Sequence, residues 1–84
     1  MAAVTIYTTY ACPYCVRAKQ LLQHKGVDYQ EIDVSHDADE RMALVQRTGR
    51  RTVPQIFINE QSIGGCDELY ALERAGRLDP LLSV

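Results

Sequence analysis

Two cysteines separated by two residues, Cys12-Pro13-Tyr14-Cys15, lie between a strand-like segment and a helix-like segment. Val4–Thr8 is short and rich in β-formers, which indicates a buried strand. The segment from 13 to 25 carries apolar residues at helical spacing: Ala18, Leu21 and Leu22. Pro13 suits the first turn of a helix, because the N–H that proline lacks has no partner there. The sequence therefore predicts that the cysteine pair opens a helix directly after a strand.

The rest of the chain alternates between strand and helix patterns. We predict strands at 27–34, 55–58 and 61–63, a helix capped by Ser35 and ended by Gly49, a helix at about 67–75, and a docked tail at 78–82. The order βαβαββα predicts an α/β fold with three helices and a four-stranded mixed sheet, which has a parallel first pair and a terminal hairpin. No linker or repeat interrupts residues 1–84, so we expect a single domain.

The composition argues against several classes of function. Nine Lys and Arg residues against eleven Asp and Glu residues give a net charge of −2, which does not suit nucleic acid as the main partner. No apolar stretch approaches the roughly 18 residues that cross a bilayer, and residues 1–4 lack the features of a secretion signal. We expect a cytoplasmic protein with no membrane partner. In a chain of 84 residues the core is thin, which favours chemistry at the surface.

The three cysteines, Cys12, Cys15 and Cys66, do not suit a disulfide-stapled secreted protein, which carries a larger and even set. In a cytosolic chain, a closely spaced pair serves metal binding or redox chemistry. Zinc needs about four ligands, and Cys66, His24 and His36 supply no second pair at metal-ligand spacing. We therefore expect redox chemistry and no metal.

The position of the pair assigns a role to each sulfur. Thiol–disulfide exchange begins with a thiolate, and an ordinary thiol is mostly protonated at neutral pH. Cys12 would lie at the first turn of the helix, where unpaired N–H groups and the positive end of the dipole stabilise an anion. Cys15 would lie about one turn deeper, within reach of Cys12 and more shielded from solvent. We predict that Cys12 attacks and that Cys15 resolves.

A second informative stretch, Thr52-Val53-Pro54, precedes a predicted strand. Proline cannot donate to a sheet ladder, so it belongs at the first residue of a strand or in a turn.

The charges along the chain are segregated: residues 28–40 contain acids but no Lys or Arg, whereas 12–27 and 41–51 contain only basic charged residues. The predicted fold therefore places positive charge on two segments that flank Cys12.

Three motifs occur in this order along the chain: Cys12-Pro13-Tyr14-Cys15, Thr52-Val53-Pro54 and Gly64-Gly65-Cys66-Asp67. At these separations they resemble the dithiol glutaredoxins, most closely the short bacterial ones of the glutaredoxin 3 type, and the resemblance covers essentially the whole chain. It implies a thioredoxin fold and a cytosolic oxidoreductase with glutathione as its electron donor. It also implies a cis Pro54 that leaves the Val53 backbone free to pair with a thiol peptide.

The resemblance implies a role for each motif. The Cys12 position is the nucleophile, and the Cys15 position resolves protein disulfides. The Val53 position pairs its backbone with the cysteine of glutathione, and the segment from Gly65 takes the γ-glutamyl end. A helix N-terminus binds a carboxylate, and an aspartate accepts from an ammonium, which fits this role. The glutathione contacts expected on this basis are Tyr14, Arg41, Thr52, Val53, Pro54, Gly65, Cys66 and Asp67.

Some of these residues have a second explanation. Arg41 falls where the family often binds the glycine carboxylate, but a solvated helix arginine competes with that role. Cys66 is favoured as a packing residue that contributes its backbone amide, over a regulatory thiol. The family usually carries a lysine three residues before the nucleophile, where this chain has Thr9. Either Arg41 or Arg51 replaces that charge, or glutathione binds less tightly.

We therefore predict a monomeric, glutathione-dependent thiol–disulfide oxidoreductase that reduces protein disulfides and glutathione mixed disulfides. Its expected partners are glutathione, protein disulfides and glutathionylated proteins. Two other functions stay open: a thioredoxin-like reductant served by a flavoprotein reductase, and a carrier of a [2Fe–2S] cluster held by Cys12 of two chains and two glutathiones. The second is disfavoured by Pro13, which removes an amide that would cradle a cluster sulfur.

Overall fold

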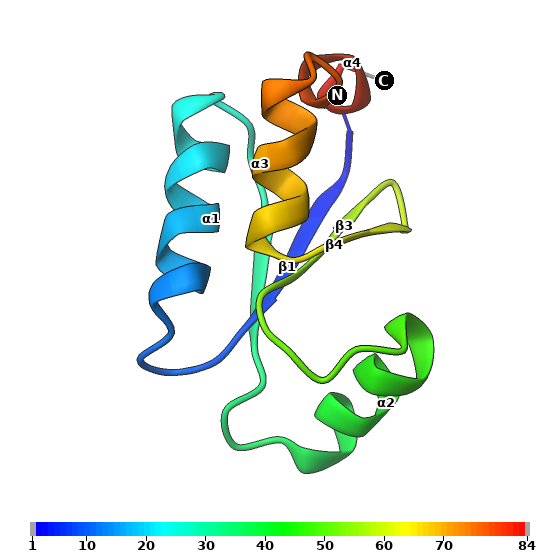
Figure 1. Cartoon of the computed structure of the whole chain (residues 1–84). Coiled ribbons are helices and arrows are strands. Elements are labelled where there is room, and N and C mark those ends of the chain that lie inside the picture. The colour runs from blue at the N-terminus through cyan, green and yellow to red at the C-terminus, as the bar shows by residue number, and fades with distance from the viewer. Residues whose placement is uncertain (1, 84) are drawn as a thin grey trace.

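A mixed four-stranded sheet lies at the centre of the computed structural model, which describes residues 2–83 (Figure 1). The elements in chain order are β1 (Val4–Thr8), α1 (Pro13–His24), β2 (Gln30–Asp33), α2 (Ala38–Thr48), β3 (Gln55–Ile58), β4 (Gln61–Gly64), α3 (Cys66–Arg74) and α4 (Leu78–Leu82). The strands lie in the order β2-β1-β3-β4. β1 and β2 are parallel, whereas β3 is antiparallel to both β1 and β4. The predicted fold class is confirmed.

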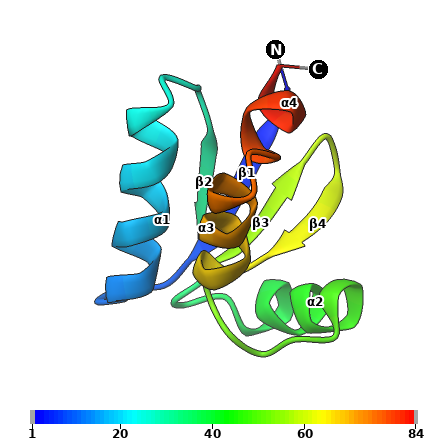
Figure 2. The ribbon, with the colours of Figure 1, turned by 45° about the horizontal axis from the view of Figure 1, so that its top comes forward.

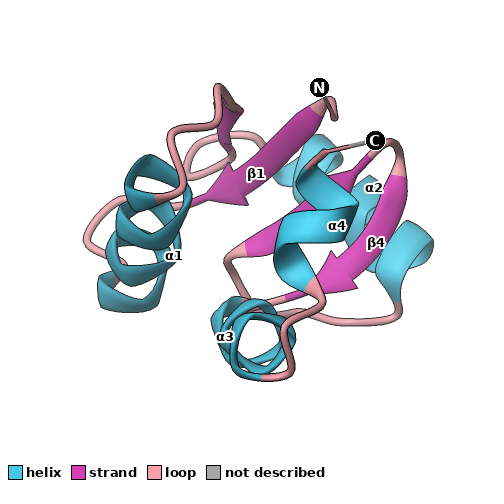
Figure 3. Cartoon of the chain, turned by 90° about the horizontal axis from the view of Figure 1, so that it is seen from above, coloured by secondary structure: helices cyan, strands magenta, loops and turns pink. Residues whose placement is uncertain are grey.

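Helices cover both faces of this sheet (Figure 2). Alternate residues of a strand point to opposite faces, and in β1 this separates Ile6 from Tyr7. Ile6 belongs to a cluster with buried residues of α1, α3 and α4, among them Leu22 and Leu69. Tyr7 belongs to a smaller cluster, under α2, with Val34, Leu44 and Phe57. Seen from above, α1 and α3 lie on one side of the sheet and α2 lies on the other (Figure 3).

The larger cluster supplies most of the apolar burial. Ile6, Leu22, Ile56 and Leu69 are each fully buried, and a buried side chain of this size stabilises the fold by about 1.5–3 kcal/mol. The smaller cluster is more aromatic: the rings of Tyr7 and Phe57 meet edge to face with centroids 5.7 Å apart. The sheet is thus held from both faces, which fixes the strand ends that carry the motifs.

Ala2, ahead of β1, is tied to the last helix, because its N–H donates to the carbonyl of Leu82 over 3.2 Å. The predicted docked tail is in place, and it forms the short helix α4 because Leu78 and Leu82, four residues apart, both enter the larger cluster. The ammonium of Lys25, at the end of α1, forms ion pairs with Glu73 at 2.7 Å and Asp79 at 2.9 Å.

Among residues 2–83, none of the helices has the length and apolar character needed to cross a membrane.

The strand predicted at 27–34 is shorter in the structure. β2 begins only at Gln30, because the loop before it is hydrogen-bonded to the last turn of α1. The N–H of Val27 donates to the carbonyl of Leu22 over 3.4 Å. That bond holds the chain against the last turn of the helix, away from the β1 ladder.

The predicted cap of the second helix is wrong. Asp37 caps α2, and its carboxylate accepts the N–H of Glu40 over 3.0 Å. The hydroxyl of Ser35 instead accepts the backbone N–H of Tyr10. Ser35 therefore ties the loop before the cysteine pair to the end of β2. Gly49 ends α2, as predicted, in the left-handed conformation with φ of 72°.

Candidate active site

The sheet topology brings the three motifs to one edge. The cysteine pair follows the end of β1, and β3 runs antiparallel to β1 with Tyr7 opposite Gln55. The start of β3, directly after Pro54, therefore lies beside the end of β1. β4 runs back along β3 with Gly64 opposite Ile56. Each motif is thus next to the same sheet edge, although up to about 50 residues separate them along the chain.

Cys12 is the N-cap residue of α1, and its side chain is partly exposed. Its sulfur accepts the backbone N–H of Cys15 over 3.1 Å. Pro13 occupies the first helical position, as predicted. Ala11, directly before Cys12, has a φ of 55°, a left-handed conformation that turns the loop into the helix. The amide and the positive end of the α1 dipole both favour negative charge on this sulfur.

Cys15 has the opposite environment. Its side chain is 2% exposed, so the predicted shielding from solvent is present. Burial, followed by the hydrogen bond with Cys12, raises the pKa of the Cys15 thiol to about 12. A partly exposed sulfur beside an amide donor and a buried, protonated sulfur three residues later are suited to different steps of a thiol exchange.

The cysteine loop contacts the proline segment directly. The thiol of Cys12 donates to the carbonyl oxygen of Val53 over 3.8 Å. The peptide bond between Val53 and Pro54 is cis, as the resemblance implied. Gln55, fully buried behind this bond, donates its side-chain amide to the carbonyl of Thr52 over 2.9 Å. The segment from Thr52 to Pro54 is therefore held from behind, while Val53 is partly exposed beside the Cys12 sulfur.

A groove of about 290 Å³ runs from the cysteine loop past this segment to the start of α3. The predicted glutathione contacts that line it are Tyr14, Thr52, Val53, Pro54, Gly65, Cys66 and Asp67. Tyr14 is 55% exposed, so its ring forms an open wall at one end. Asp67 is exposed in the first turn of α3. Amides of a helix N-terminus and the exposed carboxylate of Asp67 therefore lie at the same groove.

Gly65 permits the two walls of the groove to meet. A Cβ on this residue would lie 3.1 Å from the carbonyl oxygen of Pro54 and 3.4 Å from a carboxylate oxygen of Glu68. Glycine alone allows this close approach of backbones without displacement. The width of the groove is therefore set partly by the absence of a side chain.

Sequence reasoning missed two groove residues, Arg50 and Glu68. The carboxylate of Glu68 accepts the N–H of Gly65 at 2.7 Å and a guanidinium N–H of Arg50 at 2.8 Å. The Gly65 N–H, and after it Arg50, hold the pKa of the Glu68 carboxyl below its ordinary value. The helix was predicted to start at about residue 67, whereas its N-cap is Gly65, which makes Glu68 the third helical residue, where glutamates cap helices.

Arg41 lies outside this groove. It lines a second groove of about 450 Å³ beside α2, together with Arg51. Thr52 and Val53 line both grooves, so their segment separates the two spaces. The basic residue that borders both is Arg50. Positive charge is thus present near the Thr52 end of the first groove, but it comes from Arg50 and not from Arg41 or Arg51.

Cys66 is 4% exposed at the first residue of α3. Burial raises the pKa of its thiol, although the charge of Arg17 acts in the opposite direction. These properties fit the packing role favoured from the sequence. Within residues 2–83, no cluster of three or more His, Cys, Asp or Glu side chains could hold a metal ion.

Comparison with known proteins agrees with this geometry. The sequence model of the glutaredoxin family matches residues 4–63. A glutaredoxin of Pseudomonas aeruginosa is 60% identical over 84 residues, covering the whole of both chains. Glutaredoxin 3 of Escherichia coli K12 is 58% identical over 82 residues, which cover 98% of this chain and 99% of the relative.

Solved structures give the same result. A buckwheat glutaredoxin–glutathione complex has a TM-score of 0.91 at 38% identity, over 98% of this chain and 77% of that one. The glutaredoxin of Brucella melitensis has a TM-score of 0.88 at 54% identity, over 98% and 89% of the two chains. The fold is therefore that of solved glutaredoxins. On sequence, fold and the placing of its motifs, the chain belongs to the glutaredoxin family.

Proposed function

We propose that this glutaredoxin reduces both glutathione mixed disulfides and protein disulfides, with Cys12 as the nucleophile, Cys15 as the resolving thiol and glutathione as the electron donor. Membership of the family already gives the protein a glutathione-dependent thiol redox role. The proposal adds the role of each cysteine in this chain. The observation that carries it is the contrast between two sulfurs. The Cys12 sulfur is partly exposed and accepts a hydrogen bond from a backbone N–H, whereas the Cys15 thiol is buried.

Mixed disulfides need only the first sulfur. The Cys12 thiolate attacks the glutathione sulfur of the mixed disulfide, the S–S bond breaks, and the substrate cysteine leaves as a thiolate that takes a proton from water. Cys12 then carries glutathione. A second glutathione thiolate attacks this new disulfide, releasing oxidised glutathione and the free Cys12 thiolate. Each turnover therefore consumes one reduced glutathione, because the other half of the oxidised glutathione comes from the mixed disulfide itself.

Protein disulfides need both sulfurs. Cys12 attacks one sulfur of the substrate disulfide and forms a mixed disulfide with it, and the other substrate cysteine leaves as a thiol. Cys15 then attacks Cys12, forms the Cys12–Cys15 disulfide and releases the reduced protein. Because the pKa of Cys15 is about 12, this thiol stays protonated and does not compete for the first attack.

Glutathione is proposed to bind in the groove beside Cys12. The Val53 backbone would pair with its cysteine, and the start of α3 with its γ-glutamyl carboxylate, where Asp67 accepts from the ammonium. The buckwheat relative was solved in complex with glutathione, which supports this assignment. Arg50 is the basic residue best placed for the glycine carboxylate, and Arg41 in the neighbouring groove is the alternative.

The proposed partners are glutathione, glutathionylated proteins and protein disulfides. The protein would act as a monomer in the cytoplasm, a compartment that keeps reduced glutathione and few structural disulfides. The absence of a metal from its chemistry also stays a prediction.

The electron donor is the decisive test of the proposed function. Turnover of a small glutathione mixed disulfide should proceed with glutathione and glutathione reductase. It should fail with a flavoprotein thioredoxin reductase as the only source of electrons. Activity with the flavoprotein alone would reject glutathione as the donor. A stable brown dimer after anaerobic reconstitution with iron and sulfide would favour the cluster carrier instead.

A further inference from the structure

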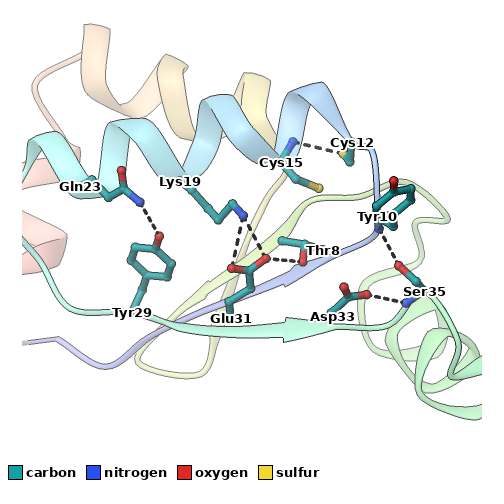
Figure 4. A network of polar contacts seen from close by, with 10 residues as sticks. All are labelled: Thr8, Tyr10, Cys12, Cys15, Lys19, Gln23, Tyr29, Glu31, Asp33 and Ser35. Carbon is teal, nitrogen blue, oxygen red and sulfur yellow. Dashed lines mark hydrogen bonds and ion pairs between the residues drawn. The ribbon is translucent and has the colours of Figure 1, made fainter.

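Lys19 lies on α1 four residues after Cys15, and neither sequence motifs nor the groove include it. Residues four apart share one face of a helix. Figure 4 shows both side chains leaving α1 on the side that faces β1 and β2. The Lys19 ammonium is therefore on the inner side of the helix, near the buried sulfur and away from the open groove.

The sheet holds this ammonium in place through Glu31, whose carboxylate is held in turn by Thr8. Glu31 of β2 accepts from the Lys19 Nζ at 3.1 Å and 3.3 Å through its two carboxylate oxygens. Thr8 at the end of β1, only 1% exposed, donates its hydroxyl to the same carboxylate at 2.8 Å. The Lys19 side chain is 26% exposed, so water reaches it only in part. A lysine with a free, mobile side chain would have no such fixed position.

The resolving step has an electrostatic cost that this lysine can reduce. Cys15 must become a thiolate to attack, and burial makes that state costly. Among the groups around this sulfur, the Thr9 backbone and the Lys19 charge lower the pKa of Cys15, while Cys12 raises it. The hydrogen bond to Glu31 raises the pKa of Lys19, so the ammonium is fully charged at neutral pH.

We propose that Lys19 is a positioning residue for the resolving step: fixed by Glu31 and Thr8, its ammonium stabilises the thiolate of Cys15 as that sulfur attacks Cys12. The inference rests on the proposed function, which assigns this attack to Cys15. The Cys15 thiol gives its proton to water, its sulfur bonds to Cys12, and the substrate cysteine leaves and takes a proton from water. Cys12 and Cys15 are oxidised as the substrate disulfide is reduced.

The other titratable groups near this pair act consistently with the proposal. Tyr29, Glu31 and Asp33 face Lys19 from β2 and the residue before it. Lys19 pairs with Glu31, and both His36 and Lys19 act on the charge of Asp33. Removing the ammonium withdraws a favourable charge and also leaves the Glu31 carboxylate unbalanced. Both changes disfavour the Cys15 thiolate.

The experiment follows the covalent intermediate between Cys12 and a disulfide-bonded protein such as insulin. Reduced protein is mixed with the substrate, and the reaction is quenched with acid at successive times. The intermediate is then quantified by mass spectrometry, so that its decay reports attack by Cys15. Lys19→Met should raise the pKa of Cys15, which lowers the thiolate population by more than it raises the nucleophilicity of each thiolate. The decay should therefore slow about threefold at each pH between about 6 and about 9.

Charge and anchoring are separated by matched variants. Lys19→Arg keeps the charge and should restore the decay rate. Lys25→Met removes an ion-paired lysine at the other end of α1 and should leave the rate unchanged. Turnover of a small glutathione mixed disulfide, which bypasses Cys15, should change less than about twofold in Lys19→Met and shows that the variant is folded.

The outcomes distinguish this inference from the proposed function. Equal decay of the intermediate in Lys19→Met and the original protein at every pH would overturn the role of Lys19. So would a Lys19→Arg protein as slow as Lys19→Met, because charge would then not be the cause. A Cys15→Ser protein that still resolves the intermediate would instead refute the division of roles between the two cysteines.

Discussion

The backbone N–H of Cys15 donates to the sulfur of Cys12 over 3.1 Å, so the resolving residue also supports the attacking one. The donor is part of the main chain and does not depend on the Cys15 side chain. The two contributions of Cys15, an amide to the first step and a thiol to the second, are therefore separable by substitution.

Cys15→Ser keeps the amide and loses the thiol. We expect it to retain turnover of a small glutathione mixed disulfide within about threefold, and to lose reduction of protein disulfides. Cys12→Ser should abolish both reactions, because it removes the attacking sulfur. Steady-state assays of both substrates with each purified variant measure this. Equal losses of the two activities in Cys15→Ser would contradict the assigned roles.

Asp67→Asn should weaken glutathione binding. The exposed carboxylate in the first turn of α3 lines the groove, and the amide keeps its shape without its charge. Loss of a charge-assisted bond to the ammonium of about 1.4 kcal/mol should raise KM for glutathione about tenfold with kcat nearly unchanged. Asp39→Asn, also in the first turn of a helix but on α2, is the matched control. An unchanged KM in Asp67→Asn would remove this residue from the binding site.

Gly65→Ala should alter the groove itself. The added Cβ would lie 3.1 Å from the Pro54 carbonyl, so the two walls must separate. We expect a higher KM for glutathione and a loss of about 1–2 kcal/mol of unfolding free energy. Gly49→Ala, at φ of 72° with no neighbour within 4 Å, should lose stability through backbone strain and keep its KM. A KM increase shared equally by both variants would indicate a general effect on the fold.

Glu68 should make stability depend on acid pH. Its carboxyl has a pKa below the ordinary 4.5 in the folded protein, first through the Gly65 N–H and then through Arg50. A lowered folded pKa stabilises the fold above the ordinary value, and this contribution is lost as the pH falls through the folded pKa. Urea unfolding should therefore show a difference between the original protein and Glu68→Gln that is largest near about pH 7 and shrinks below about pH 4.5. Glu60→Gln, in the exposed turn between β3 and β4, serves as the control. A pH-independent difference would show that the charge of Glu68 contributes nothing.

Local patterns were enough to predict most elements. The strand at Val4–Thr8, the helix opened by Pro13 and the end of α2 at Gly49 all follow from propensity and turn chemistry within a few residues. The cap of α2 was misassigned because Ser35 and Asp37 are both good N-caps in isolation. The choice between them depended on the loop before the cysteine pair, which takes the Ser35 hydroxyl through Tyr10.

The groove was only partly predictable. Motif residues were identified through resemblance to a family, and Tyr14, Val53 and Asp67 lie on its walls. No local sequence pattern distinguishes Arg50 from Arg51 or Arg41, since all three look like solvated arginines in the sequence. The partner that fixes it, Glu68, is 18 residues away along the chain.

The sequence by itself determined the order of the elements, the place of the two cysteines at the start of a helix, and the family. These depend on short-range patterns and on motif spacing, both of which a single chain displays. The tertiary structure decided which basic residue borders the groove, how closely its walls meet at Gly65, and which charge lies beside Cys15. Those properties arise where strands pair and helices pack, so they depend on distances between segments that are remote in the sequence.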